Sequence, residues 1–173
     1  MTPSFDVKDK VFVITGAAGI LCSEMAQELA ALGAKVAVLD LNVDRAAMVA
    51  DEIVKTGGHA SAFCCNVLDK ASIEQAKENV LNAYGRVDCL INGAGGNHPQ
   101  ASASAELCFF DIPQEAMRFV TGLNFMGTLM PSQVFGRVMA DQGFGNIINI
   151  ASMAGIRPLT RVVGYGAPEQ LPQ

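Results

Sequence analysis

The stretch Val11–Cys22 constrains the fold of this chain more than any other. It reads Val-Phe-Val-Ile-Thr-Gly-Ala-Ala-Gly-Ile-Leu-Cys, so apolar, largely β-branched residues lead into a turn with Gly16 and Gly19. A helical pattern begins directly after the turn, which predicts a buried strand followed by a helix N-terminus. The first N–H groups of such a helix have no partner within it, and its dipole favours negative charge. Because glycine lets the backbone approach a ligand closely, this arrangement is typical of a diphosphate site.

Composition and charge narrow the function classes open to the chain. Its 173 residues are 50% hydrophobic and 17% charged, the composition of one globular domain covering residues 1–173. The net charge of −5 argues against a general nucleic-acid or anionic-membrane surface. No apolar run is long enough to span a bilayer and no secretory signal opens the chain, so a cytoplasmic location is expected.

Cysteine and histidine usage favours neither a metal centre nor a disulfide framework. The five cysteines are odd in number and contain no Cys-x-x-Cys pair, so we expect buried, reduced thiols. With only His59 and His98 in the chain, no metal site is expected.

Short apolar strands alternate with helical patterns over most of the chain. We predict strands over residues 10–14, 35–40, 60–65, 87–92 and 146–150. Because the strands are nearly continuous apolar runs separated by helices, they predict a parallel sheet with helices on both faces. Right-handed crossovers then give a doubly wound α/β fold of the Rossmann type.

The helical segments carry their own start and stop signals. Asp44 is the expected N-cap of the second helix, and Asp69 or Ser72 that of the third. The apolar stripe expected on the first helix is Leu21, Met25, Leu29 and Leu32.

The second half of the chain opens with a long irregular stretch over residues 93–112, which we expect to be a functional or mobile loop. A long helix is then predicted over residues 113–141. Pro131 lies inside it and removes the N–H that would bond the carbonyl of Gly127, so a kink is expected near residues 124–127.

Polar residues and glycines stand at the ends of three predicted strands. Asp40 lies 24 residues after Gly16, where a carboxylate accepts both hydroxyls of an adenosine ribose and repels a 2′-phosphate, which predicts NAD rather than NADP. The alternative is a solvated loop aspartate. Asn66 pairs with an adenine edge or is an ordinary strand-end residue. The glycines of residues 92–95 give the cofactor room or simply open a loop.

Three further polar residues form a candidate catalytic group. Ser152 follows the fifth strand and Tyr165 lies thirteen residues further on, so both hydroxyls are placed to converge on one substrate oxygen with Asn124 nearby. Tyr165 is the candidate proton donor or acceptor and Ser152 the orienting group. Taken singly, Ser152 also reads as a turn residue and Tyr165 as a loop anchor.

Together these residues resemble the short-chain dehydrogenase/reductase family. The resemblance covers the chain through Tyr165 and rests on Thr15-Gly-Ala-Ala-Gly19, Asp40, Asn92-Gly-Ala-Gly95, Asn124, Ser152 and Tyr165. Within the family, the chain is similar to the D-mannonate oxidoreductase (D-fructuronate reductase) branch. The stretches that carry this similarity are residues 91–99, 123–131, 146–150 and 157–161.

The resemblance implies a strand order of 3-2-1-4-5 and hydride transfer between NAD and a sugar-acid carbonyl. Tyr165 protonates the alkoxide, Ser152 holds the substrate oxygen, and Asn124 supports a bound water. The implied substrate contacts are Asn97, His98, Arg157 and Arg161, with either arginine pairing with the uronate carboxylate. The implied cofactor contacts are Thr15, Gly16, Ala18, Gly19, Ile20, Leu21, Asp40, Leu41, Asn66, Val67, Asn92, Gly93, Ala94 and Gly95.

The chain departs from the family pattern after Tyr165. The family places a lysine four residues after its tyrosine, whereas this chain has Glu169. An ammonium lowers the pKa of a nearby phenol and a carboxylate raises it, so the substitution works against acid–base catalysis at neutral pH. We also expect the last strands and helix of the family to be missing, which exposes residues 146–150 as an apolar sheet edge and makes the family's homo-oligomer doubtful here.

Three functions are therefore compared. The first is an NAD-dependent reductase of a small-molecule sugar acid, with no nucleic-acid or membrane partner. The second is a dinucleotide-binding module that turns nothing over, or a different gluconate-type reductase. The third is a fragment that folds poorly.

Overall fold

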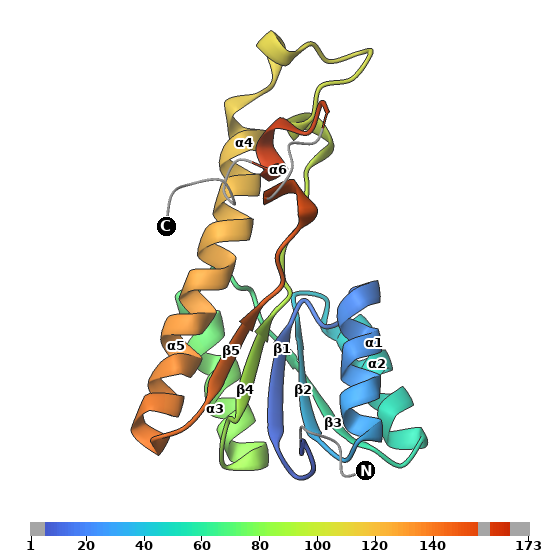
Figure 1. Cartoon of the computed structure of the whole chain (residues 1–173), viewed down its shortest axis with the longest axis vertical. Helices are drawn as coiled ribbons and strands as arrows, with labels where there is room; N and C mark the ends of the chain where they lie inside the picture. The colour runs from blue at the N-terminus through green and yellow to red at the C-terminus, as the bar shows by residue number, and fades with distance from the viewer. Residues whose placement is uncertain (1–5, 156–159, 167–173) are drawn as a thin grey trace.

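The fold is a five-stranded parallel sheet covered by helices (Figure 1). The computed structural model describes residues 6–155 and 160–166, and within them the strand order is β3-β2-β1-β4-β5. The strands are β1 (Val11–Thr15), β2 (Lys35–Asp40), β3 (His59–Cys64), β4 (Cys89–Asn92) and β5 (Asn146–Asn149). The doubly wound sheet and the strand order are confirmed, and each predicted strand is found with its ends displaced by two residues at most.

The side chains of successive residues in each strand point to opposite faces of the sheet. Phe12 and Ile14 of β1 face α1 (Ile20–Ala31) and α2 (Val43–Lys55), whereas Val11 and Val13 face α3 (Lys70–Tyr84) and α5 (Gly127–Gln142). All five residues of β1 are buried, as expected for a central parallel strand. The result is two apolar layers with the sheet between them.

The apolar stripe predicted for α1 is wrong at Leu21 and Leu32, whereas Leu29 packs, partly buried, against the core. The residues that α1 buries are Cys22, Ala26 and Ala30, while Leu21 and Leu32 are 56% and 62% exposed. Small side chains on the inner face let α1 approach the sheet closely, and they fill that space at interior packing density. The predicted spacing is helical, but Leu21 and Leu29 each lie one position before a residue that α1 buries.

The N-cap predicted for α2 is wrong, and of the two candidates for α3 the structure selects Asp69. Asn42, not Asp44, is the N-cap of α2, because its side-chain oxygen accepts the N–H of Arg45 at 3.0 Å. Asp69 caps α3 by accepting the N–H of Ala71 at 3.0 Å, and Gly85 ends that helix at φ 74°.

The long helix predicted over residues 113–141 is present but interrupted. α4 (Gln114–Thr121) leads into a π-helical segment, η3 (Gly122–Met126), and then into α5, which contains Pro131. The interruption overlaps the predicted kink near residues 124–127 and begins two residues earlier. π-Helical turns often carry functional residues, and this one carries Asn124.

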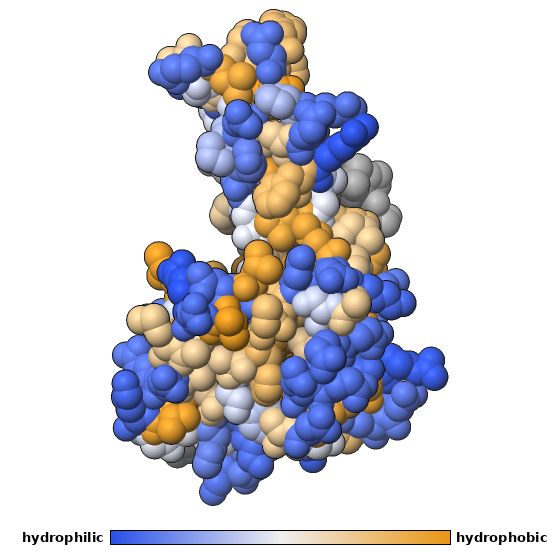
Figure 2. Space-filling model, turned by 180° about the vertical axis from the view of Figure 1, so that it is seen from behind, coloured by the Kyte–Doolittle hydropathy of each residue, from blue (hydrophilic) through white to orange (hydrophobic). Residues whose placement is uncertain are grey.

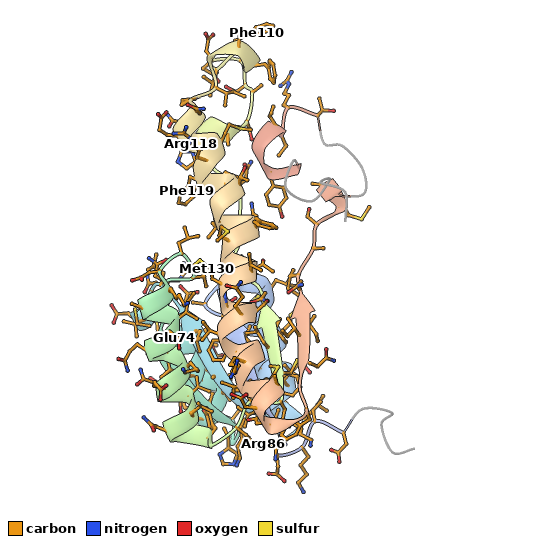
Figure 3. The ribbon with its side chains drawn as sticks, turned by 90° about the vertical axis from the view of Figure 1, so that its left-hand side faces the viewer. Glu74, Arg86, Phe110, Arg118, Phe119 and Met130 are labelled. Carbon is orange, nitrogen blue, oxygen red and sulfur yellow. The ribbon has the colours of Figure 1, made fainter. Side chains whose placement is uncertain are left out.

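The loop and helix above the carboxyl ends of the strands form a projecting lobe, residues 97–122 with residues 160–166. It includes the short helices η1 (Pro99–Ala101), η2 (Phe109–Asp111) and α6 (Val163–Gly166). It has a small core of Ala101, Ala116 and Val120, against which Tyr165 packs. Phe110 lies at its far end (Figure 3), and apolar side chains gather where the lobe joins the body (Figure 2).

β5 is an edge strand among the residues that the structure describes. It pairs with β4 alone there, and Ile147 and Ile148 are 37% and 42% exposed. The predicted exposed apolar edge is therefore present.

The five cysteines are free thiols, but not all are buried. Cys22, Cys65 and Cys89 are buried as expected, whereas Cys64 and Cys108 are exposed. Cys64 ends β3 and Cys108 lies in the lobe, where little covers a side chain.

Across residues 6–155 and 160–166, the structure contains no helix with the length and apolarity needed to cross a membrane.

Candidate functional site

The carboxyl ends of β1 and β4 pack against each other backbone to backbone. Thr15 is fully buried, and its hydroxyl oxygen accepts the N–H groups of Gly93 and Ala94, each at 3.2 Å. A Cβ on Gly16 would lie 2.8 Å from the Cα of Ala94, and one on Gly93 would overlap the sulfur of Cys22. These glycines are therefore needed first for the contact between the two turns.

A hollow opens above this contact. It has a volume of about 370 Å³, and Figure 2 shows the surface notched between the lobe and the body. Its wall includes most of the residues expected to contact the cofactor: Gly16, Ala18, Gly19, Ile20, Leu21, Asp40, Gly93, Ala94 and Gly95. Cys22 also lines it, and burial, with the Asp40 charge adding to the effect, raises the pKa of that thiol, so this part of the wall is neutral.

The N-terminus of α1 faces this hollow without a cap of its own. Gly19 is the N-cap residue and offers no side-chain hydrogen bond, and the first turn of α1 has no acidic residue. In contrast, Asn42 and Asp69 cap α2 and α3 with their side chains. Because Gly19, Ile20 and Leu21 line the hollow, the orphan N–H groups of α1 are left for an anion.

Asp40 closes one side of the hollow. Its carboxylate accepts the N–H of Ala18 at 3.0 Å and that of Asn42 at 2.9 Å. These two bonds join the glycine turn, the end of β2 and the start of α2. The carboxylate is thereby held at the mouth of the hollow, where it would meet a ribose.

Asn92 points away from the hollow. It is 2% exposed, and its Nδ2 donates to Ser132 Oγ at 2.8 Å and to Asn149 Oδ1 at 2.9 Å. Its own Oδ1 is buried and has no hydrogen-bond partner within the described residues. This side chain thus joins β4 to α5 and β5.

Asn124 clamps the loop after β4. Its Oδ1 accepts the Gly96 N–H at 2.8 Å, and its Nδ2 donates to the Gly96 carbonyl at 2.9 Å. The hydroxyl of Thr128 donates to the Asn124 carbonyl at 3.0 Å, and that of Ser132 donates to the Thr128 carbonyl at 2.7 Å. Since Ser132 also accepts from Asn92, a series of hydrogen bonds through Ser132 and Thr128 links Asn124 to the end of β4.

A second, smaller hollow adjoins the first. It has a volume of about 130 Å³, shares the lining of Gly93–Gly95 and Ile150, and brings Asn124 and Tyr165 together. Ala151 also lines it, and Ser152 follows directly in the chain. Ser152 Oγ accepts the Ala154 N–H at 3.2 Å, which shapes the turn after β5.

The other predicted cofactor contacts lie beside the hollow. Leu41 lines a shallow depression that shares Asp40 with it. Asn66 uses its side-chain oxygen to accept the Leu68 N–H at 3.0 Å, so the oxygen proposed for adenine has a local partner. Val67 is buried in the core, and its side chain packs against Gly127.

The predicted substrate contacts that the structure describes, Asn97, His98 and Arg161, belong to the lobe. Asn97 donates to Ser102 Oγ at 2.9 Å, and His98 accepts the Gln100 N–H at 3.2 Å. Arg161 is exposed, and its carbonyl accepts the Ala103 N–H at 2.9 Å. Arg157 and Glu169 lie outside the described residues.

Sequence reasoning missed Arg45, Cys22 and Ile150, all of which line the first hollow. The sequence signal for Arg45 is its position in the first turn of the helix that follows Asp40, five residues further along the chain. Cys22 and Ile150 read as core residues, and no local pattern separates them from other apolar positions.

Comparison with known proteins identifies the family of the chain. The family model for the short chain dehydrogenases matches residues 10–168. The chain belongs to this family. It is 41% identical over 170 residues to an uncharacterized oxidoreductase of Haemophilus influenzae and 43% identical over 166 residues to an uncharacterized oxidoreductase, UxuB, of Bacillus subtilis. These matches cover 92% and 91% of this short-chain dehydrogenase and 60% of each relative.

A solved structure has the same fold over nearly the whole of this chain. It is that of a Haemophilus protein assigned as a D-mannonate oxidoreductase, with bound NAD. The TM-score is 0.89 at 39% sequence identity, and the match covers 95% of this chain and 62% of that one. This short-chain dehydrogenase thus spans about three fifths of the length of the proteins it matches.

Proposed function

We propose that this chain binds NAD(H) in the hollow above β1, β2 and β4. The observation that carries the proposal is the uncapped N-terminus of α1 facing a glycine-lined hollow with Asp40 at its mouth. The diphosphate would be held by the N–H groups at the start of α1, and the adenosine ribose by the Asp40 carboxylate. The relative solved with bound NAD supports the choice of ligand.

The residues present fit that ligand. The hollow offers orphan N–H groups for the diphosphate and a carboxylate for the ribose hydroxyls. Asp40 would repel a 2′-phosphate, so NAD rather than NADP is the proposed cofactor.

We further propose that the chain supplies the cofactor half of an oxidoreductase acting on a sugar acid of the D-fructuronate/D-mannonate type. NADH held in the first hollow would supply a hydride for the carbonyl carbon of the substrate. Tyr165, which shares its hollow with Asn124, donates the phenolic proton to the oxygen of that carbonyl, and Ser152 orients the oxygen. Asn124 keeps the Gly95–Gly96 loop in place, because both ends of its amide are bonded to Gly96.

Binding is tested with a matched pair of leucines on α1. Leu21→Glu places a carboxylate in the first turn, where the helix dipole stabilises it but where it repels a diphosphate. Leu32→Glu alters an equally exposed leucine at the other end of α1. In a titration followed by NADH fluorescence, L21E should lose binding without loss of stability, and L32E should bind as the unaltered chain does. Equal affinities for L21E and L32E would contradict the proposed site.

Turnover separates the reductase from a module that only binds. NADH oxidation with D-fructuronate and NAD reduction with D-mannonate should both occur, and Tyr165→Phe should lower the rate by about 10²–10⁴-fold with little change in NADH affinity. NADH binding without turnover would instead support the binding module, which Glu169 at the position of the family's lysine favours.

A further inference from the structure

Two hydroxyl groups on α5 connect β4 to Asn124. Ser132 Oγ accepts a hydrogen bond from Asn92 Nδ2 at 2.8 Å, and it donates to the Thr128 carbonyl at 2.7 Å. Thr128 Oγ1 in turn donates to the Asn124 carbonyl at 3.0 Å. Each hydroxyl therefore bonds the carbonyl four residues before it, and Ser132 also reaches the strand.

These bonds lie where the regular backbone bonding of the helix is interrupted. The π-helical turn η3 does not follow the α-helical bonding pattern, and Pro131 has no N–H to donate to the carbonyl of Gly127. A hydroxyl that bonds a carbonyl four residues back often bends a helix. The hydroxyls of Thr128 and Ser132 are thus placed to shape the turn that carries Asn124.

The link between Ser132 and the strand has a cost at Asn92. Asn92 is 2% exposed, and its Nδ2 donates to both Ser132 and Asn149, whereas its Oδ1 has no hydrogen-bond partner within the described residues. A buried polar atom without a partner destabilises a fold, and replacing both partners of a polar pair by apolar groups can be nearly neutral. The polar link between Asn92 and Ser132 therefore points to a role other than stability.

Asn124 cannot move without moving the loop after β4. Both ends of its side-chain amide are bonded to Gly96, and a Cβ on Gly95 would lie 2.8 Å from Asn124 Oδ1. Residues 93–95 of this loop line both the cofactor hollow and the smaller hollow that contains Tyr165. A displacement of Asn124 would therefore be transmitted to the wall that the two hollows share.

We propose that Ser132 and Thr128 are positioning residues: their hydroxyls hold Asn124, and through it the wall that the cofactor hollow and the Tyr165 hollow share. Both act through Asn124 and not on the substrate itself. The inference rests on the proposed function, because the shared wall serves the reaction when NADH extends from the first hollow toward Tyr165. It adds to the site two residues that lie four and eight positions after Asn124.

The first measurement follows the Gly96 amide and needs no ligand. Gly96 donates its N–H to Asn124 Oδ1, so its ¹H shift and its exchange with solvent report on that bond. Ser132→Ala and Thr128→Val each remove one hydroxyl. Each should move the Gly96 signal and speed its exchange about 2–10-fold, the size expected for the loss of one neutral hydrogen bond. Thr128→Ser keeps the hydroxyl and should leave the Gly96 signal in place.

Gln142→Ala is the matched control for a general loosening of α5 against the sheet. Gln142 lies at the other end of α5, where its side chain accepts the Val87 N–H at 3.1 Å and donates to the Val87 carbonyl at 2.8 Å. Q142A should lower the free energy of unfolding in urea but leave the Gly96 amide unchanged. Equal changes at Gly96 in Q142A and S132A overturn the inference. If S132A does not fold, T128V against T128S decides it, and equal Gly96 signals in those two variants overturn it.

The second measurement connects the shared wall to the cofactor. ADP carries only the adenosine and diphosphate groups proposed for the first hollow, whereas NADH also extends toward Tyr165. In calorimetry on folded protein, S132A and T128V should weaken NADH binding by a similar factor and leave ADP binding unchanged, and Q142A and T128S should alter neither. Unchanged NADH affinity in S132A and T128V, or an equal loss for ADP, overturns the inference.

The proposed function fails in a different way. If the unaltered, folded chain binds neither NADH nor ADP, the proposed cofactor site is wrong, while the Gly96 comparison still decides whether the two hydroxyls hold Asn124. The two failures are therefore distinguishable.

Discussion

The contact between the two glycine turns makes a quantitative prediction for Gly16→Ala. Gly16 has φ 64°, and an added Cβ would lie 2.8 Å from the Cα and N of Ala94. The left-handed conformation costs a non-glycine residue about 1–2 kcal/mol. Displacing the Ala94 backbone adds about 1–3 kcal/mol, as in other overpacked sites. The total of about 2–5 kcal/mol is a large share of the 5–15 kcal/mol typical of a domain.

Gly85→Ala separates the two contributions. Gly85 ends α3 with φ 74°, and an added Cβ there meets nothing within 4 Å. Its substitution should therefore cost only the conformational part, about 1–2 kcal/mol. Urea unfolding followed by circular dichroism gives the free energy of unfolding, and an NADH titration gives the affinity. G16A should lose more stability than G85A and also lose NADH affinity, which G85A should keep. Equal destabilisation of the two variants, with NADH affinity unchanged in G16A, would refute the packing argument.

Three further predictions follow from the described structure. Burial acts to raise the pKa of Asp88, but hydrogen bonds from Arg86 and Val11 and the charges of Arg86 and Lys10 outweigh it and lower the pKa overall. The contribution of Asp88 to stability should therefore be complete above the unfolded-state pKa of about 3.9 and be lost as the pH falls through the lower folded value. Asp88→Asn should then flatten the pH dependence of the urea midpoint between about pH 5 and 2. A pH dependence unchanged by the substitution would count against this role of Asp88. In native thiol labelling, Cys64 and Cys108 should react before the three buried cysteines, because burial raises the pKa of Cys65 to about 12 and of Cys89 to about 11; uniform labelling rates would contradict this. The exposed β5 edge should make the 173-residue chain self-associate in sedimentation, and Ile148→Lys should reduce that association, whereas a sharp monomer that binds no apolar dye would exclude it.

Local sequence was sufficient for the sheet and for the turn at its centre. The apolar strands and the turn with Gly16 and Gly19 depend on a few neighbouring residues, so they can be predicted without tertiary information. Asp69 was likewise one of the two candidate caps for α3, because its side chain accepts a backbone N–H only two residues away.

Features decided by packing could not be read in this way. The inner face of α1 carries Cys22, Ala26 and Ala30, because the distance between helix and sheet selects small side chains over the leucines next to them. Asn92 likewise resembles a ligand contact in sequence, yet its partners Ser132 and Asn149 are 40 and 57 residues away. Only the fold brings them together.

Only part of the candidate site was predictable from the sequence, again because packing decides the rest. Residues of the first turn and Asp40 lie on short, regular segments whose ends meet at one edge of the sheet, so their convergence follows from topology. Arg45 points into the hollow from a helix whose start depends on Asn42, and the cap was predicted two residues late. The orientation of the Arg45 side chain could therefore not be predicted from the sequence.

The most direct test of the central claim is an amide ¹H–¹⁵N spectrum of the chain titrated with NADH. The account predicts saturable shifts of Gly16, Ala18, Gly19 and Gly93–Gly95, whose backbones line the hollow. Gly57 and Gly85, which end α2 and α3, should stay unmoved and serve as internal controls. A dispersed spectrum of folded protein in which the hollow residues do not shift, or in which shifts are confined to other surfaces, would contradict a cofactor site at this turn.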